Sequence, residues 1–286
     1  MSDHDEGPRA ASSELRRAVG MTSVDDQPLR LGGMALRNGL LVHGPTHWAA
    51  AVRGRDGSIQ VASGRKPRAP QAVDRIPGAR GVVRLGEAMA VIPLVRAALP
   101  EARLPFENAA VVGAAAAASL GGFAARRRLR GGRGELAAAA LSLVPSLVAL
   151  RVGDTAAYHG VEHKSIAAYE QGGEDAAEAS KEHDRCGSHL VAPMLAMNLA
   201  GVAILRRVVE QPSPLAGGLL SLVSAGAAVE VFVWSERHAD HPVSRALRVP
   251  GYELQRVIGT REPTATQLEV GHAALEEILR VEGLAA

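Results

Sequence analysis

The residues best suited to chemistry lie close together near the middle of the chain. Three histidines, Glu162 and the only cysteine of the protein occur in the stretch from His159 to Cys186. Imidazole and thiolate groups are ligands that zinc and related metal ions prefer. Apolar segments long enough to form helices flank this stretch on both sides. The sequence therefore predicts a metal site at a membrane boundary.

The first part of this stretch has helical spacing. If residues 158–170 form a helix, His159, Glu162 and His163 lie at positions i, i+3 and i+4 on one face. Two imidazoles one turn apart can chelate one ion, and the glutamate between them can act as a general base or orient a histidine. The pattern His-x-x-Glu-His also matches the inverted zinc-peptidase signature, although a match this short is weak on its own.

The second part, His183-x-x-Cys186, adds another imidazole and a thiol. The intervening residues 171–182 are acidic and contain glycine, so we expect a loop that can fold back. We predict that His159, His163, His183 and Cys186 bind a divalent metal ion, with zinc as the first choice and iron as the second. Glu162 is the predicted catalytic base. The alternative is that these histidines only form hydrogen bonds at the boundary between water and lipid.

Four apolar segments predict membrane-spanning helices. They cover roughly residues 109–125, 135–150, 189–205 and 215–234, carry almost no charge and are bounded by arginines. Small residues recur in them at the spacing of packed membrane helices. Buried helices of a soluble α-protein are the alternative. We predict a mainly α, polytopic helical membrane protein with about four spans, located in the cell membrane and in contact with the lipid bilayer.

The remaining segments are expected to surround this helical domain. Residues 1–28 are polar and lack an apolar core, which predicts a disordered tail rather than a signal peptide. Residues 29–80 are predicted to contain β-structure, with a hairpin turn at Asp56-Gly57. Residues 81–107 predict an amphipathic helix interrupted by Pro93. The transmembrane domain, 108–240, would contain the metal loop 151–188, and a helical tail would follow at 241–286.

Composition and charge exclude some classes of function. A single cysteine excludes an intramolecular disulfide, and a net charge of +2 gives little support for a nucleic-acid partner. The arginines of residues 126–130 and 206–207 favour a cytoplasmic location for these loops. With four spans, that location would place the amino-terminal region outside. We favour a cytoplasmic amino terminus, because no export signal is evident, and leave the orientation open.

Two further features could contribute to a site. Glu230 stands within the last apolar segment, where a carboxylate implies a partner. It could be a distal metal ligand, a proton relay or a hydrogen-bond acceptor between helices. The segment from His43 to Trp48 is either a turn between strands or a loop that faces the substrate.

The chain resembles the bacterial YqhQ-like membrane proteins, a family of unknown biochemical activity often described as metal-dependent enzymes. The resemblance extends over residues 31–280. It rests on three blocks: residues 32–39 with 44–45 and 48–53; residues 158–164 with 169–170 and 183–187; and residues 250–256 with 260–263 and 267–270. It implies a polytopic membrane protein with a metal site and supplies no reaction. The chain departs from the expected pattern at Met34, Asn38, Asp184 and Ser188.

These observations predict metal-assisted hydrolysis, or a related conversion, of an unknown small-molecule or peptide substrate. One alternative is a non-enzymatic transporter or assembly factor in which the metal is structural. Four protein ligands would indicate that role, and an open position would indicate catalysis. The other alternative is a membrane peptidase of the His-x-x-Glu-His type, which needs a carboxylate ligand such as Glu230. The oligomeric state is not indicated.

Overall fold

The computed structural model describes residues 28–70, 73, 79–129, 132–172, 175–209 and 213–284. All of the predicted amino-terminal tail except Pro28 lies outside these residues. Contacts between Cα atoms group Leu31–Ala286 into one unit, which is described here by itself. The predicted divisions of the chain after residues 80, 107 and 240 stay predictions.

The segment predicted as β-structure forms a four-stranded antiparallel sheet. Its strands are β1 (Gly32–Ala35), β2 (Gly39–His43), β3 (His47–Arg53) and β4 (Ile59–Arg65), and they lie in the order β1-β2-β3-β4. Gly57 turns the chain between β3 and β4 with a positive φ of 86°, a conformation that favours glycine. The Asp56 carboxylate accepts a hydrogen bond from the backbone N–H of Ser58 at 3.0 Å, which stabilises this predicted hairpin turn.

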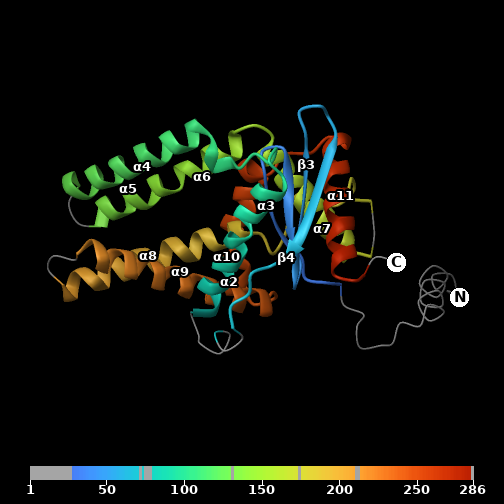
Figure 1. The fold of residues 1–286 in the computed structure, drawn as a ribbon. Coiled ribbons are helices and arrows are strands. Elements are labelled where there is room, and N and C mark those ends of the chain that lie inside the picture. Colours follow the sequence, from blue (N-terminus) through green and yellow to red (C-terminus); the bar gives the residue numbers. More distant parts are fainter. Residues whose placement is uncertain are drawn as a thin grey trace, which may run out of the picture. The chain divides into compact units, whose positions relative to one another are not determined.

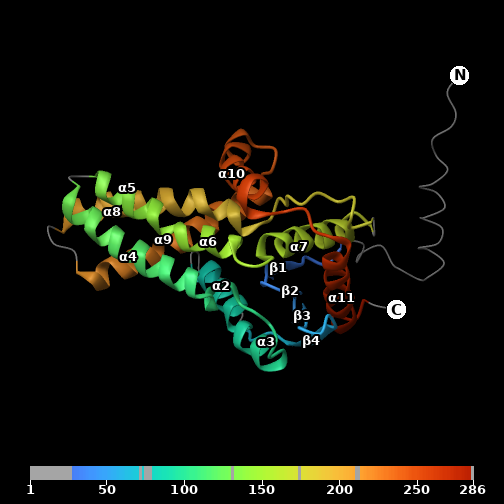
Figure 2. The same cartoon turned by 90° about the horizontal axis from the view of Figure 1, so that it is seen from above.

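Alternation along β3 directs side chains to both faces of the sheet. Trp48, Ala50 and Val52 belong to a buried apolar core that includes residues of α3 (Ile92–Ala98). Ala49 and Ala51 must point to the opposite face, because successive strand residues alternate. The helices α7 (Thr155–Glu170) and α11 (Ala265–Val281) pack there. Figure 2 shows the strands between α3 and α7, with α11 alongside.

The apolar segments form helices that extend away from the sheet (Figure 1). They are α4 (Ala109–Arg128), α5 (Gly132–Ser142), α6 (Val144–Arg151), α8 (Val191–Val208) and α9 (Pro214–Arg237). The stretches Ala109–Arg128, Gly132–Arg151, Gly187–Val208 and Leu215–Arg237 are long and apolar enough to cross a membrane. At most 17% of each stretch is buried in the protein. This confirms the prediction of a helical membrane protein with four candidate spans.

Shorter helices connect the sheet to the long ones. The predicted amphipathic helix is divided at Val91 into α2 (Ala79–Ala90) and α3, because Pro93 stands in the first turn of α3, where a helix tolerates proline. After α9 come α10 (Pro242–Leu254), a π-helical turn η4 (Gln255–Gly259) and α11. Two 3-10 turns, η2 (Pro105–Glu107) and η3 (Gly187–Leu190), precede α4 and α8.

Candidate metal centre

Helix α7 carries the predicted His-x-x-Glu-His motif and is buried along most of its length. Two glycines permit its close packing. A methyl group at Gly160 would collide with the backbone oxygen of Arg261, and one at Gly271 of α11 would collide with Val161 and Ser165. Because α7 is enclosed in this way, its polar side chains depend on protein partners rather than on bulk water.

The structure brings together three of the predicted ligands. One potential ligand atom from each of His159, His163 and Cys186 lies within 4.8 Å of the other two. The centroids of the two imidazole rings are 4.3 Å apart, as expected for residues one helical turn apart. The Cys186 Sγ lies 3.4 Å from the His159 Nε2. The stretch after α7 therefore folds back as predicted, and it places the thiol beside the motif.

Backbone carbonyls determine which nitrogen of each ring carries the proton. The Nδ1 of His159 lies 2.8 Å from the oxygen of Gly259, and the Nδ1 of His163 lies 2.6 Å from the oxygen of Lys181. Carbonyl oxygens only accept hydrogen bonds, so both Nδ1 atoms must be the donors. In the neutral rings, each Nε2 atom therefore carries a lone pair, and that of His159 faces the Cys186 thiol. Metal-binding histidines commonly have this arrangement.

The His163 Nε2 is a buried polar atom without a hydrogen-bond partner among the described residues. An unpaired buried nitrogen is costly in a folded protein and suggests a ligand. Burial, helped by the charge of His159, lowers the pKa of His163 to about 2. The ring is therefore neutral at physiological pH, which is the form that binds metal ions.

Cys186 is buried at the start of the turn η3. The backbone N–H of Ser188 donates a hydrogen bond to its Sγ at 3.5 Å. Burial raises the pKa of the thiol, and the contacts with Ser188 oppose this shift. The thiol is therefore protonated in the metal-free protein, and metal binding would release its proton.

Glu162 lies on α7 directly against the strand β1. A methyl group at Gly33 would come within 2.8 Å of the Glu162 side chain, so only glycine leaves room for the carboxylate at this position. Burial raises the pKa of Glu162 to about 7, although the charge of His159 opposes the shift and Cys186 adds to it. Glu162 can thus exchange a proton near neutral pH.

His183, the fourth predicted ligand, lies beside the cluster but outside the closest group. Its ring centroid is 5.6 Å from that of His163. Its Nδ1 accepts a hydrogen bond from the backbone N–H of Arg185 at 3.2 Å, and its Nε2 lies 3.5 Å from the Glu170 carboxylate. Burial lowers its pKa, and Asp184 and Glu236 oppose this shift. Both ring nitrogens have protein partners, and metal ligation by His183 stays a prediction.

Gln255 is a buried residue that the sequence patterns did not single out. It holds the loop of residues 183–188, which carries Cys186. The Gln255 Oε1 accepts a hydrogen bond from the His183 backbone N–H at 2.8 Å, and its Nε2 donates to the Ser188 Oγ at 2.8 Å. Gln255 begins the π-helical turn that ends at Gly259, whose carbonyl orients His159. Such π-turns often occur at functional sites. No spacing rule in the sequence links Gln255 to a motif about a hundred residues earlier.

A second residue not singled out, Lys164, holds the acidic stretch in place. Its Nζ donates to the backbone oxygens of Ala177 and Ala179, at 3.0 and 2.7 Å. The same Nζ forms an ion pair with Glu262 at 2.7 Å. Lys164 directly follows His163, which could have suggested a role, but a sequence pattern does not reveal its partners, two backbone oxygens and the distant Glu262.

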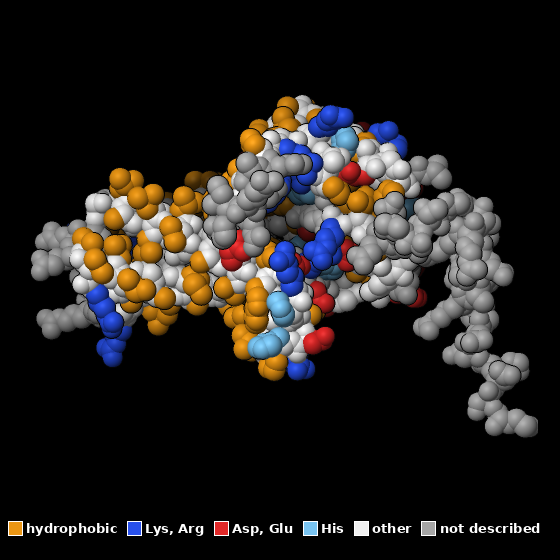
Figure 3. Space-filling view, turned by 90° about the horizontal axis from the view of Figure 1, so that it is seen from below, with side chains coloured by type: hydrophobic (Ala, Val, Ile, Leu, Met, Phe, Trp, Pro, Cys, Tyr) orange, Lys and Arg blue, Asp and Glu red, His pale blue; other side chains and the backbone are white. Residues whose placement is uncertain are grey.

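The candidate ligands line a cleft of about 660 Å³ between the sheet and the long helices. Charged and histidine side chains gather around a hollow on the face shown in Figure 3, whereas hydrophobic side chains cover the helical bundle. His43 also lines the cleft, and its buried Nδ1 has no hydrogen-bond partner among the described residues. Glu230 lies in α9 and belongs neither to the described lining nor to the close ligand group.

Comparison with known proteins identifies the part of the chain that contains this cluster. Residues 148–281 match a family of proteins of unknown function, DUF1385. This part of the chain belongs to the YqhQ-like DUF1385 family. The uncharacterised protein YqhQ of Bacillus subtilis (strain 168) is 34% identical over 134 residues, which cover 44% of this chain and 41% of that protein. The match thus spans less than half of its relative. No solved structure matches significantly.

The DUF1385 segment contains the whole His159–Cys186 cluster, together with Gln255 and Gly259. The second and third blocks of the predicted resemblance lie inside it. The first block, in β1 to β3, lies outside the matched residues, so its part of the resemblance stays a prediction. The ligand candidates and the backbone groups that orient them therefore belong to one family segment.

Proposed function

We propose that this protein is a metal-dependent enzyme of the hydrolase type, embedded in the cell membrane as a multi-pass protein. His159, His163 and Cys186 would hold one divalent ion, with zinc preferred and iron second. The observation that carries the proposal is the buried, unpartnered Nε2 of His163 beside the Nε2 of His159 and the thiol of Cys186. A mixed set of imidazole and thiol ligands suits zinc.

The number of ligands supports a catalytic rather than a structural ion. Structural zinc sites use four protein ligands, whereas catalytic sites use three. The close group contains three candidates, and both nitrogens of His183 have other partners. The group also borders a cleft, which a purely structural site does not require. When bound, the ion would supply Lewis acidity to the reaction.

Glu162 would be the proton-transfer residue. It lines the same cleft as the three ligand candidates and is fixed against Gly33 of β1. A carboxyl group whose pKa lies near 7 can both accept and return a proton at physiological pH. Its role would be to take a proton from the attacking group and to deliver it to the leaving group.

The lining of the cleft favours an amphiphilic substrate. Apolar side chains from β1, the helices α6 to α8 and α10 form much of the wall, while Lys66 and Arg185 add positive charge. The apolar contributors are Leu31, Met34, Ala35, Ala88, Pro105, Ala149, Leu150, Ile166, Val191 and Leu254. Small molecules and peptides both remain candidates.

The peptidase alternative receives no support from the described residues, because Glu230 is not in the close ligand group. The structural-metal alternative differs from our proposal in its dependence on His183. A closed site needs His183 as the fourth ligand, and a catalytic site does not.

The test is metal analysis of the full-length protein purified in detergent. We expect one zinc or iron ion per chain, lost in His163→Ala and Cys186→Ala and retained in His272→Ala, a control on the exposed surface of α11. Glu162→Gln should retain the ion but fail to replace the wild-type gene in cells. Absence of a stoichiometric ion from the wild type would refute the proposal. Loss of the ion from His183→Gln, with full function of Glu162→Gln, would favour a structural metal.

A further inference from the structure

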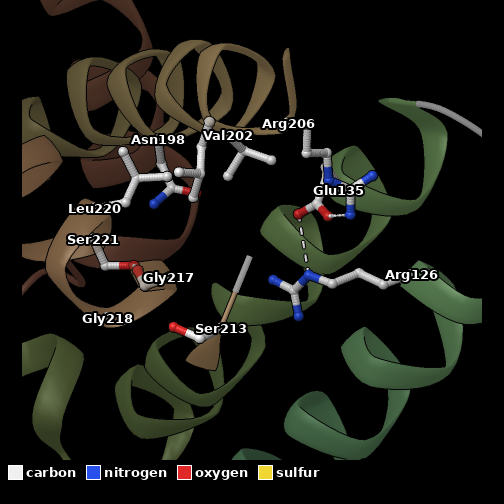
Figure 4. A pocket seen from close by; sticks show the side chains of 11 residues that line it. Arg126, Glu135, Asn198, Val202, Arg206, Ser213, Gly217, Gly218, Leu220 and Ser221 are labelled. Atoms are coloured by element: carbon white, nitrogen blue, oxygen red, sulfur yellow. Dashed lines mark hydrogen bonds and ion pairs between the residues drawn. The ribbon is translucent and has the colours of Figure 1, made fainter. Parts of the chain in front are cut away.

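A second polar site lies at the opposite end of the long helices, away from the sheet. Glu135, at the start of α5, accepts hydrogen bonds from the Arg126 Nε of α4 at 3.0 Å and from an Arg206 Nη of α8 at 2.5 Å. Figure 4 shows the two guanidinium groups approaching this carboxylate from different helices. The three side chains border a cavity of about 340 Å³.

The opposite wall of the cavity is formed by the start of α9 and by α8. Ser213 caps α9 by accepting a hydrogen bond from the Ala216 N–H at 3.2 Å. Methyl groups at Gly217 and Gly218 would meet no atom within 4 Å, so these glycines leave the cavity open. The amino terminus of a long helix carries partial positive charge, which adds to that of the arginines.

We propose that this cavity binds the phosphate of an anionic phospholipid. Each guanidinium has five N–H donors, and the Glu135 carboxylate occupies only part of them while it fixes the orientation of both groups. A planar guanidinium matches the geometry of phosphate oxygens. Arg126 and Arg206 thus form a clamp whose geometry is fixed before a ligand arrives.

The charge of the surrounding chain favours an anion despite the single buried carboxylate. Residues 126–135 and 206–210 together contain seven arginines and two glutamates, a net charge of +5. Figure 3 shows Lys and Arg side chains at this far end of the apolar bundle. Basic pockets between membrane helices are typical binding sites for anionic headgroups.

The position of the cavity favours a lipid over a soluble anion. Arg126 and Arg206 lie near the ends of two candidate spans, where lipid headgroups are found. Large apolar side chains within two residues of the cavity lining in the sequence are exposed and could contact acyl chains. They are Leu136, Val208, Leu215 and Leu219, with exposed fractions from 55% to 78%.

The experiment is native mass spectrometry of the full-length protein in detergent, titrated with phosphatidylglycerol, phosphatidylcholine or glycerol 3-phosphate. We expect phosphatidylglycerol to bind at least ~10-fold more tightly than the other two. Arg126→Gln and Arg206→Gln should each weaken its binding about tenfold. The matched controls Arg127→Gln and Arg207→Gln remove neighbouring charges that do not line the described cavity. These two substitutions should change the affinity for phosphatidylglycerol less than about twofold.

Equal effects of the four substitutions would overturn the proposal in favour of general surface attraction. Equal binding of phosphatidylcholine would also overturn it. Binding of glycerol 3-phosphate as tight as that of phosphatidylglycerol would identify a soluble phosphate ligand instead. Arg206→Lys keeps the charge without the planar fork, so weaker binding in this variant would separate the clamp from simple charge. Size-exclusion chromatography of each variant excludes unfolding as the cause.

Discussion

The two polar sites of this molecule are fixed by different kinds of partner. In the candidate metal centre, carbonyl oxygens of Gly259 and Lys181 orient the two histidines. At the far end of the bundle, Arg126, Glu135 and Arg206 orient one another through side chains alone, and the two arginines are about half-exposed. Backbone partners can fix a ring to the precision that metal binding needs. Side-chain partners can hold two cationic donors side by side for a larger ligand such as a lipid headgroup.

The largest expected effect concerns the packing that brings the backbone partners to α7. Gly160→Ala would place a methyl group against the Arg261 backbone oxygen, which cannot move without shifting the segment after the π-turn. We expect a loss of about 3 kcal/mol in the free energy of unfolding. Thermal unfolding in detergent would measure it. Gly86→Ala in α2, where the methyl group meets no atom within 4 Å, is the control and should stabilise the protein slightly, by up to about 1 kcal/mol, because alanine favours a helix.

The fold and part of the site follow from local patterns in the sequence. The long apolar segments, the hairpin turn at Gly57 and the grouping of His159 with His163 depend on composition and short-range periodicity. Gln255 and Gly259 could not be found in this way, because they reach the site through tertiary packing. For the same reason, residue type did not distinguish His183 from His159. Only the structure shows that the Nδ1 of the His183 ring contacts the backbone N–H of Arg185 and that its Nε2 contacts Glu170.

The next effect concerns pH and tests burial at the edge of the cleft. Burial first, and Lys66 second, lowers the pKa of His43 from 6.5 to about 4. The unfolded chain therefore binds more protons than the folded protein between these values. This difference should cost up to about 3 kcal/mol of stability as the pH falls from 6.5 to 4, with no further change at lower pH.

The measurement compares unfolding of the wild type and His43→Asn across this pH range. The variant should lack this part of the pH dependence, so the difference between the two proteins should change steadily from pH 6.5 to 4. Parallel stability curves would show that His43 is not held neutral in the folded protein. Other histidines of the cleft affect both proteins equally and cancel in the difference.

Gln255→Leu tests whether the hydrogen bonds from Gln255 to His183 and Ser188, on either side of Cys186, determine the affinity for the metal ion. The change leaves the His183 N–H and the Ser188 hydroxyl without their buried partner. We expect metal affinity to fall 10- to 100-fold, which is typical when an outer partner of a metal ligand is lost. Competition with a chromogenic chelator would measure it. Gln60→Leu in β4 is the matched control, and an equal loss there would argue against a specific role for Gln255.

The smallest effect is expected at the arginine end of the bundle. Glu135→Gln would leave Arg126 and Arg206 close together without the carboxylate between them. Because both arginines are about half-exposed, we expect a loss of only about 1 kcal/mol at low salt. Raising the ionic strength to about 1 M should reduce this loss by screening. The loss caused by Gly160→Ala should not depend on salt, and a similar salt dependence of both would contradict the contrast between the two sites.

The five-residue turn Gln255–Gly259 also constrains how the length of this chain can vary. Deleting one residue there would favour an ordinary α-helical turn and rotate the following segment by about 100°. The Gly259 carbonyl would then leave the His159 ring, and α11 would present a different face to the sheet. Insertions and deletions among homologues should therefore accumulate in the connections between α4 and α5 and between α8 and α9, and be absent between Gln255 and Gly259.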